Sequence, residues 1–193
     1  MHRRDFLTAA TVTMAASAGL SAGPATAETQ VPQVNATEAD RRAMGEAIAL
    51  MRKAGVVDKT GGPFGAVIMR GGEILAASGN SVLKDNDPSA HAEVNAIRIA
   101  CKKVEAPNLK GATMYTSCEP FPMCYSTAYW ARIDKIYFAA SWSDYADLFD
   151  DQNIGEDLKL PYASRRVPIS QMMQSEAQTV WNEYRKLPQK TRY

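Results

Sequence analysis

The sequence Asp87-Pro88-Ser89-Ala90-His91-Ala92-Glu93 is the first of two short stretches that carry residues of the metal-binding kind. The second is Thr116-Ser117-Cys118-Glu119-Pro120-Phe121-Pro122-Met123-Cys124. Proline is favoured just inside a helix start, because its missing N–H costs nothing there. We therefore predict helices over 88–104 and 120–131, with His91 and Cys124 in their first turns. Glu93 follows His91 by two residues, so a metal ligand and a proton-transfer group can share one cavity.

The two stretches match most of a known pattern. Zinc-dependent nucleobase deaminases carry His-x-Glu followed by Pro-Cys-x-x-Cys. His91 and Glu93 supply the first half, and Pro120 and Cys124 supply the two ends of the second half. The pattern requires a cysteine at position 121, where this chain has Phe121. The sequence therefore predicts descent from such proteins and leaves open whether their chemistry is retained.

Hydrolytic deamination explains why these residue types are needed. A bound Zn²⁺ ionises water near neutral pH by lowering the pKa of the water to about 7. Three protein ligands leave the fourth position for that water. A carboxylate must then carry protons to the ring nitrogen and the leaving amine, and Glu93 suits this role. We predict that Zn²⁺ is the cofactor, with His91 and Cys124 as ligands.

Each of these residues also has a simpler interpretation. A lone histidine is more often a structural residue than a ligand, and a lone buried cysteine acts as a small hydrophobic side chain. His91 is the one histidine outside the N-terminal segment, and it lies in His-Ala-Glu after Asp-Pro-Ser. The complete pattern favours the ligand interpretation for both His91 and Cys124.

Length and charge set broad limits. The chain has 193 residues, which suits one compact domain, and 46% of them are hydrophobic. It carries 22 basic and 21 acidic side chains, for a formal net charge of +1. Nothing in this balance requires a nucleic-acid partner. We expect a small-molecule ligand and no nucleic acid.

The N-terminal segment is not expected to be part of the fold. Arg3-Arg4-Asp5-Phe6-Leu7 followed by a moderately apolar run is typical of a twin-arginine export signal. Ala25-Thr26-Ala27 fits a cleavage site, so residues 1–27 are predicted to be removed. A membrane anchor is the alternative, but the run is short and rich in small residues. Removal takes away two basic residues and one acidic residue, which leaves a neutral, periplasmic protein with no membrane segment.

Three cysteines, Cys101, Cys118 and Cys124, do not make a disulfide framework. Free thiols are a liability in an oxidising compartment unless they are buried or bound to a metal. A redox-active pair of Cys118 and Cys124 is a further hypothesis, since a helix N-terminus lowers the pKa of a nearby thiol.

The expected elements alternate between helices and strands. A capping box at Thr37-Glu38-Ala39-Asp40 predicts a helix that ends near Gly55. Gly71-Gly72 predicts the turn of a hairpin between strands over 64–69 and 74–78. Two further strands are expected over 112–117 and 136–140, and Ser170 is expected to cap a last helix. Helices alternating with strands cover both faces of a sheet. We predict an α/β fold, a three-layer α/β/α sandwich with a single mixed sheet, over residues 37–193 after a linker at 28–36.

The chain resembles the bacterial guanine deaminases of the cytidine-deaminase superfamily over most of residues 40–193. The segments that carry the resemblance are Pro63–Ile68, Asn86–Val94, Ala96–Arg98, Tyr115–Pro120, Pro122–Cys124, Tyr129–Arg132, Phe149–Asp151 and Tyr193. The last two features are specific to the guanine branch of the superfamily.

This resemblance implies roles for individual residues. It implies zinc ligands at His91 and Cys124 and a proton shuttle at Glu93. For the purine it implies a set of binding residues: Phe64, which stacks near the base, Asn80, which hydrogen-bonds it, Ala92, Asp151, and Tyr193, which closes the pocket. Asp151 would either read the polar edge of the purine or assist proton transfer. The resemblance also implies a domain-swapped homodimer, in which the C-terminal segment of one chain covers the active site of the other.

Phe121 is the departure from the family pattern, because phenylalanine offers no lone pair to a metal. Three outcomes are open: Cys118 substitutes as a ligand, zinc binds weakly with extra water, or zinc is lost. We favour a zinc-dependent hydrolytic deaminase that releases ammonia from guanine or a related aminated purine or pterin. The alternative is a non-catalytic purine-binding descendant that lost zinc through Phe121. Deamination of tRNA adenosine is disfavoured by the export signal and the neutral charge.

Overall fold

Four strands form one mixed sheet in the order β2-β1-β3-β4. The structure is a computed structural model that describes residues 34–149 and 154–190. The strands are β1 Gly65–Arg70, β2 Glu73–Gly79, β3 Ala112–Cys118 and β4 Lys135–Ala140. β1 pairs antiparallel with β2 and with β3, whereas β3 and β4 run parallel. The single mixed sheet predicted from the sequence is confirmed.

The hairpin between β1 and β2 follows from its two glycines. Gly71 and Gly72 have φ angles of 60° and 84°, in the left-handed region that side chains disfavour. A β-bulge between Ile68 and Met69 shifts the register of this pair of strands. The predicted turn is therefore confirmed at its two residues.

The first helix, α1 (Glu38–Arg52), begins at the predicted capping box. Thr37 Oγ1 accepts a hydrogen bond from the backbone N–H of Asp40 at 3.2 Å, and Asp40 Oδ2 accepts one from the N–H of Thr37 at 2.8 Å. The prediction that Gly55 ends this helix is wrong, because a π-helical turn continues over Lys53–Val57. A side chain at Gly55 would approach the Cα of Pro63 to 2.5 Å, so close packing explains this glycine.

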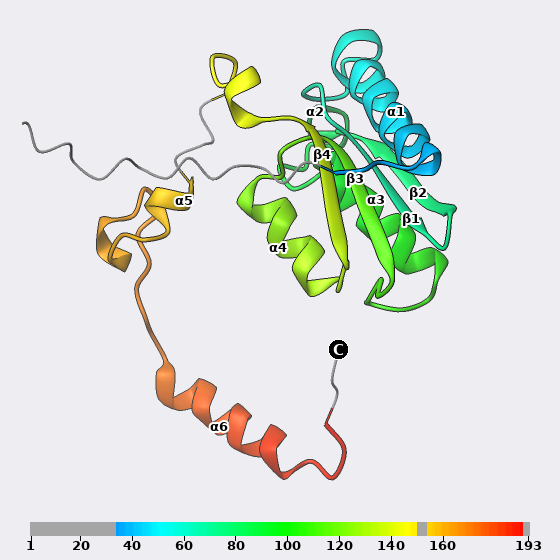
Figure 1. Cartoon of the computed structure of the whole chain (residues 1–193). Coiled ribbons are helices and arrows are strands. Elements are labelled where there is room, and N and C mark those ends of the chain that lie inside the picture. The colour runs from blue at the N-terminus through cyan, green and yellow to red at the C-terminus, as the bar shows by residue number, and fades with distance from the viewer. Residues whose placement is uncertain (1–33, 150–153, 191–193) are drawn as a thin grey trace, which may run out of the picture. The chain divides into compact units, whose positions relative to one another are not determined.

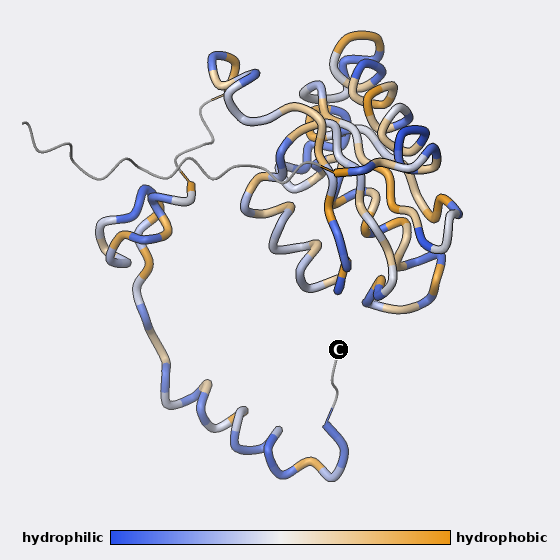
Figure 2. Tube along the Cα trace, in the orientation of Figure 1, coloured by the Kyte–Doolittle hydropathy of each residue, from blue (hydrophilic) through white to orange (hydrophobic). Residues whose placement is uncertain are grey.

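Helices cover both faces of the sheet, as Figure 1 shows. α1 packs on one face, where Ala43 and Ala47 meet Val67 and Tyr115. The other face is covered by α3 (Ala92–Lys103) and α4 (Pro122–Trp130). Figure 2 shows hydrophilic and hydrophobic residues interleaved along α1, as expected of a helix with one buried face. The three-layer sandwich is confirmed.

The two motif helices begin later than predicted. A short helix, α2 (Val82–Asp85), and a left-handed Asn86 precede Pro88, and α3 begins only at Ala92. Asp87 Oδ1 accepts hydrogen bonds from both the N–H and the hydroxyl of Ser89, at 2.8 and 2.6 Å. This local turn competes with the helix, so His91 becomes the N-cap residue of α3.

In the second stretch a proline does begin the helix, but it is Pro122 and not Pro120. Phe121 is the N-cap of α4, and Pro122 occupies its first position, so the predicted start at Pro120 is wrong by two residues. Cys124 lies in the first turn of α4, as predicted.

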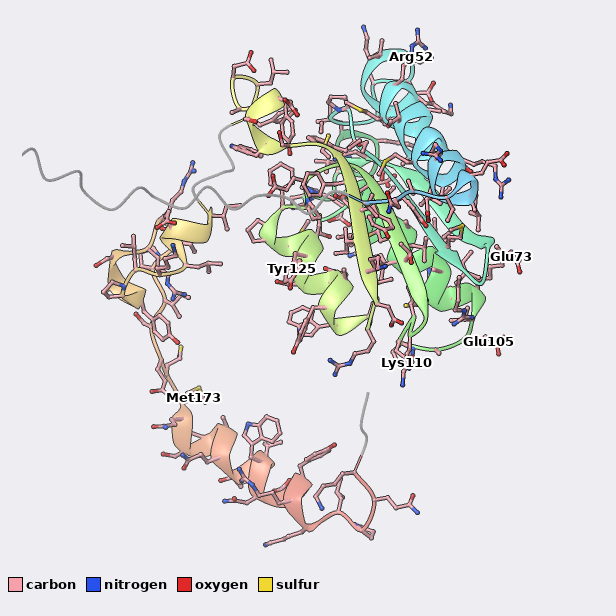
Figure 3. All side chains as sticks on the ribbon, in the orientation of Figure 1. Arg52, Glu73, Glu105, Lys110, Tyr125 and Met173 are labelled. Carbon is pink, nitrogen blue, oxygen red and sulfur yellow. The ribbon has the colours of Figure 1, made fainter. Side chains whose placement is uncertain are left out.

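The chain after β4 forms short elements and one longer helix. These are η2 (Trp142–Asp144), α5 (Ile154–Asp157), η4 (Tyr162–Ser164) and α6 (Gln174–Lys186). The last helix begins after Met173, labelled in Figure 3, so Ser170 does not cap it. None of its residues is buried.

Several predictions concern residues outside the described ranges. They include the export signal at 1–27, most of the linker at 28–36, Asp151 and Tyr193. Within residues 34–149 and 154–190, none of the helices has both the length and the apolar character needed to cross a membrane.

Candidate functional site

Three ligand-type side chains meet where α3 and α4 begin. His91 caps α3, Glu93 lies in its first turn, and Cys124 lies in the first turn of α4. His91 Nδ1 and Cys124 Sγ are 3.5 Å apart. One ligand atom from each of the three residues lies within 4.8 Å of the other two. The fold therefore brings together residues from both sequence stretches, as predicted.

Glu93 is held inside the sandwich by the sheet. Its side chain is buried, and Oε1 accepts a hydrogen bond of 3.0 Å from Thr116 Oγ1. Burial raises the pKa of the Glu93 carboxyl. Thr116 was not among the predicted site residues. Alternation along the predicted strand over 112–117 is the signal that places it on the same face as Met114.

His91 and Cys124 fit zinc. Bonds of about 2.0 Å to nitrogen and 2.3 Å to sulfur at a tetrahedral angle place these two atoms about 3.5 Å apart, close to the separation found here. Cys124 is fully buried, and burial together with the nearby Glu93 carboxylate raises the pKa of its thiol. A divalent cation reverses this effect, because it favours the thiolate as a ligand. The donor types and their spacing therefore suit a zinc ion.

Phe121 occupies the wall beside these donors. Its side chain is 7% exposed, and its ring makes edge-on contacts with His91, Phe64 and Trp142 at centroid distances of 5.6, 5.8 and 5.2 Å. The ring is therefore packed on three sides as an integral part of the site. It contributes apolar surface where the family pattern has a thiolate.

Among the described residues, Cys118 is not part of the donor group. Its side chain is buried at the end of β3, and Sγ accepts a hydrogen bond of 3.6 Å from Ser117 Oγ. Burial raises the pKa of its thiol. The group of three donors contains Glu93 in its place. The role of Cys118 as a substitute ligand stays a prediction.

Aromatic side chains extend from Phe121 around the predicted base-binding residue Phe64. Phe64 contacts the rings of Tyr145 and Phe149 at 5.8 and 5.3 Å, and Tyr145 contacts Trp142 at 4.9 Å. Tyr145 was missed by the sequence analysis because no motif contains it. The segment after β4 thus supplies most of this apolar wall.

The other two predicted substrate-binding residues that the structure describes, Asn80 and Ala92, are also buried. Asn80 follows β2, where its N–H donates to the carbonyl of Phe64 at 3.0 Å and its Oδ1 accepts from the N–H of Val82 at 3.0 Å. Ala92 lies between His91 and Glu93 and is fully buried. Both residues belong to the same end of the sheet as the donor group.

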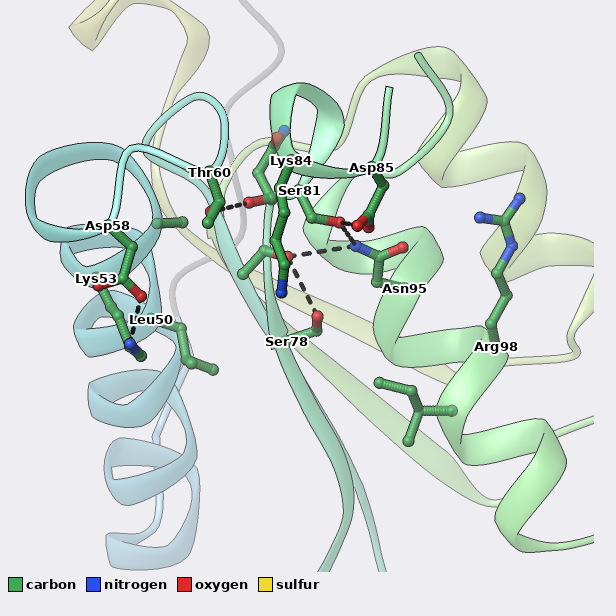
Figure 4. A pocket seen from close by; sticks show the side chains of 14 residues that line it. Leu50, Lys53, Asp58, Thr60, Ser78, Ser81, Lys84, Asp85, Asn95 and Arg98 are labelled. Atoms are coloured by element: carbon green, nitrogen blue, oxygen red, sulfur yellow. Dashed lines mark hydrogen bonds and ion pairs between the residues drawn. The ribbon is translucent and has the colours of Figure 1, made fainter. Parts of the chain in front are cut away.

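A surface pocket of about 460 Å³ lies between α1 and α3 (Figure 4), and Asn80 is one of the residues that line it. It is lined by charged side chains, among them Lys53, which pairs with Asp58, and Arg98. His91, Glu93 and Cys124 do not line it. This pocket and the donor group are therefore distinct features.

Comparison with known families identifies the fold and the donor group together. Residues 37–140 match the cytidine and deoxycytidylate deaminase zinc-binding region. The chain belongs to this deaminase family. The match spans both sequence stretches and the whole sheet, so the three donors described above lie within the matched region.

Within the deaminase family, the chain is similar to guanine deaminases. Guanine deaminase of Bacillus subtilis is 43% identical over 140 residues, which cover 72% of this chain and 90% of that protein. Its crystal structure superposes with a TM-score of 0.75 at 40% identity, over 79% of this chain and 98% of that one. A guanine deaminase from Nitrosomonas europaea matches with a TM-score of 0.54 at 29% identity, over 63% and 69% of the two chains.

The deaminase family also includes relatives that act on RNA. The tRNA-specific adenosine deaminase of Agrobacterium fabrum is 39% identical over 94 residues, which cover 49% of this chain and 60% of that protein. The similarity to the Bacillus enzyme is therefore more extensive than this one.

Proposed function

We propose that this protein is a zinc-dependent aminohydrolase that releases ammonia from guanine or a related aminated purine or pterin. The observation that carries the proposal is the group of His91, Glu93 and Cys124. The ring of Phe121 joins this group to the predicted base-binding residue Phe64, because it contacts both His91 and Phe64. The extensive similarity to guanine deaminases supports the purine class of substrate.

The side chains divide into base binding and proton transfer. Phe64 offers a ring for stacking against the base, and Asn80 offers its amide nitrogen as a donor because Oδ1 already accepts from Val82. Glu93 carries protons from water to the ring nitrogen and to the leaving amine. His91 and Cys124 would hold the zinc, which when bound would supply ionised water near neutral pH. Overall, the C–N bond to the amine is exchanged for a C–O bond to water, and ammonia leaves.

We further propose a domain-swapped homodimer. In α6, Ala177, Val180, Trp181 and Tyr184 recur at helical spacing, and Val180 and Trp181 are about 60% exposed. An exposed apolar stripe of this kind is typical of a helix face that packs against another surface. A swapped arrangement would supply that surface and would bring Tyr193 to the active site of the partner. Asp151 would read the edge of the purine bound in its own chain.

Export to the periplasm by the twin-arginine route is also proposed, on the sequence of residues 1–27 alone. Replacement of Arg3 and Arg4 by lysine is expected to retain the protein in the cytoplasm. Fractionation of cells that express the two forms measures this directly.

The decisive experiment measures zinc content and ammonia release from guanine on the same purified protein. We expect near-stoichiometric zinc and measurable turnover. Glu93→Gln is expected to lower the turnover rate by about 10²- to 10⁴-fold, because the proton carrier is lost. Glu46→Gln makes the same chemical change on an exposed turn of α1 and serves as the matched control. Protein that binds purine and releases no ammonia would instead be the non-catalytic descendant.

A further inference from the structure

The donor set at this site is one thiolate short of the family pattern. His91 and Cys124 are two ligands, and Phe121 has no atom that binds a metal. Catalytic zinc sites hold the ion with three protein ligands and one water. Within residues 34–149 and 154–190, the group of ligand-type side chains that meets here has Glu93 as its third member.

We infer that Glu93 is the third protein ligand of the zinc and that Phe121 is the residue that makes it one. The site is then a His-Glu-Cys site, and the same carboxylate both binds the metal and carries protons. This inference rests on the zinc site of the proposed function and on no particular substrate.

Charge balance supports the assignment. In the His-Cys-Cys pattern two thiolates neutralise the two charges of Zn²⁺. With Phe121, the thiolate of Cys124 leaves one positive charge in a site walled by buried side chains. An uncompensated buried charge is costly. The carboxylate of Glu93, buried beside the other two donors, restores neutrality.

Distances support it as well. Ligand atoms around one tetrahedral zinc lie about 3.3 to 3.8 Å apart. The nitrogen, oxygen and sulfur atoms of the three residues already lie within 4.8 Å of one another, so a rotation that moves the carboxylate by about 1 Å completes the set. Thr116 donates to Oε1 at 3.0 Å, and the Glu93 carboxyl also interacts with the thiol of Cys124, so it already faces this donor.

Phe121 cannot leave the site to admit another donor. Its ring is packed against His91, Phe64 and Trp142 and is almost fully buried. Cys118 is the other sulfur nearby, but its position at the end of β3 is outside the group of three. Glu93 is therefore the donor that the fold already delivers.

The test is a double-mutant cycle on zinc affinity, measured by competition with a chromophoric chelator and independent of turnover. We expect Glu93→Gln to weaken zinc binding by about 1,000-fold or more, beyond the 10- to 100-fold typical of residues that only support a ligand. In a Phe121→Cys background the restored thiolate takes the third position. In that background we expect Glu93→Gln to cause a loss of zinc affinity that is smaller by a factor of at least about ten.

Controls keep the test decisive. Cys118→Ala is expected to leave zinc affinity unchanged, and so is Glu46→Gln. Phe121→Leu removes the ring without adding a donor, so Glu93→Gln should be as damaging in that background as in the native protein. If Phe121→Cys does not fold, the comparison between Glu93→Gln and Cys118→Ala in the native background decides the matter.

The inference is overturned by equal losses in the native and Phe121→Cys backgrounds, by a native loss below about 100-fold, or by a large loss in Cys118→Ala. Failure of the proposed function looks different. Zinc affinity that depends on Glu93, in a protein that releases no ammonia from guanine, upholds the ligand and rejects the activity.

Discussion

Thr116 shows how much a single side chain outside any motif contributes to this site. It holds one oxygen of Glu93 from the neighbouring strand, and it is fully buried. Side chains that orient a ligand or proton carrier set its basicity and direction. Thr116 is therefore a positioning residue for Glu93.

We predict that Thr116→Val lowers the rate of ammonia release by about 10- to 100-fold, because the isosteric valine cannot donate to Glu93. Steady-state kinetics should place the loss in kcat rather than in KM, since the Thr116 hydroxyl donates to the proton carrier Glu93. Thr113→Val, on the opposite face of the same strand, is the control. A loss confined to KM would show that Thr116 acts on the substrate instead.

Tyr115 carries a second prediction, which concerns pH. Its side chain is buried under α1, and its hydroxyl donates to Asp40. This hydrogen bond, followed by those from Thr37, holds the pKa of Asp40 below its usual range. A lowered pKa stabilises the folded state above the unfolded pKa of about 3.9, and this contribution is lost as the pH falls through the folded pKa.

Tyr115→Phe is therefore expected to destabilise the protein by about 1 kcal/mol at pH 7, since Asp40 is partly exposed and water screens the bond. The difference from the native protein should shrink as the pH falls below the unfolded pKa of about 3.9 and through the lowered pKa of folded Asp40. Urea unfolding at several pH values measures it. Tyr137→Phe removes a neighbouring hydroxyl and should show no such pH dependence.

At the scale of elements, the contact between α1 and β1 depends on a glycine. A Cβ at Gly65 would lie 2.1 Å from the carbonyl oxygen of Ala47 and 2.6 Å from the N of Met51. The helix backbone therefore rests directly on the first residue of β1. Gly45, on the exposed side of α1, has no atom within 4 Å of the corresponding position.

These two glycines make a matched pair of predictions. Gly65→Ala is expected to destabilise the fold by about 2 to 3 kcal/mol, because α1 must move away from the sheet. Gly45→Ala is expected to stabilise it by about 0.5 to 1 kcal/mol, because alanine is the better helix former. Thermal unfolding followed by circular dichroism checks both, and equal effects would contradict the close contact.

For the whole molecule, the main question is what covers the exposed apolar side chains. They lie on α6, where Val180 and Trp181 are exposed, and on the outer side of α4, where Tyr125 (Figure 3) and Tyr129 are about 60% exposed. Apolar surface on this scale is typical of interfaces. The proposed dimer covers such surfaces with a second copy of the chain.

We predict that light scattering finds twice the mass of one chain for the native protein. Trp181→Asp should convert it to monomer, because a charge then lies on the apolar stripe of α6. Thr179→Asp adds the same charge to the other side of that helix and should leave the dimer intact. A native monomer, or dissociation by both variants alike, would reject the swapped arrangement.

The sequence by itself determined the local elements. The capping box at Thr37, the hairpin at Gly71-Gly72 and the four strands were all predictable, because their signals act within a few residues of chain. The donor residues His91 and Cys124 and the nearby carboxylate of Glu93 could also be picked out, because their types and spacing belong to a known pattern. Even so, the start of α3 was placed too early, since a turn held by Asp87 competes with the helix.

Only the tertiary structure decided the surroundings of those residues. It set Thr116 against Glu93 across 23 residues of chain, and it placed Cys124 against His91 across 33. It also packed Phe121 among rings from three segments. Such neighbours depend on how helices and strands stack across the sheet, and no local pattern encodes that stacking. The sequence showed that Phe121 removes a ligand, while the fold showed that Glu93 stands beside the two that remain.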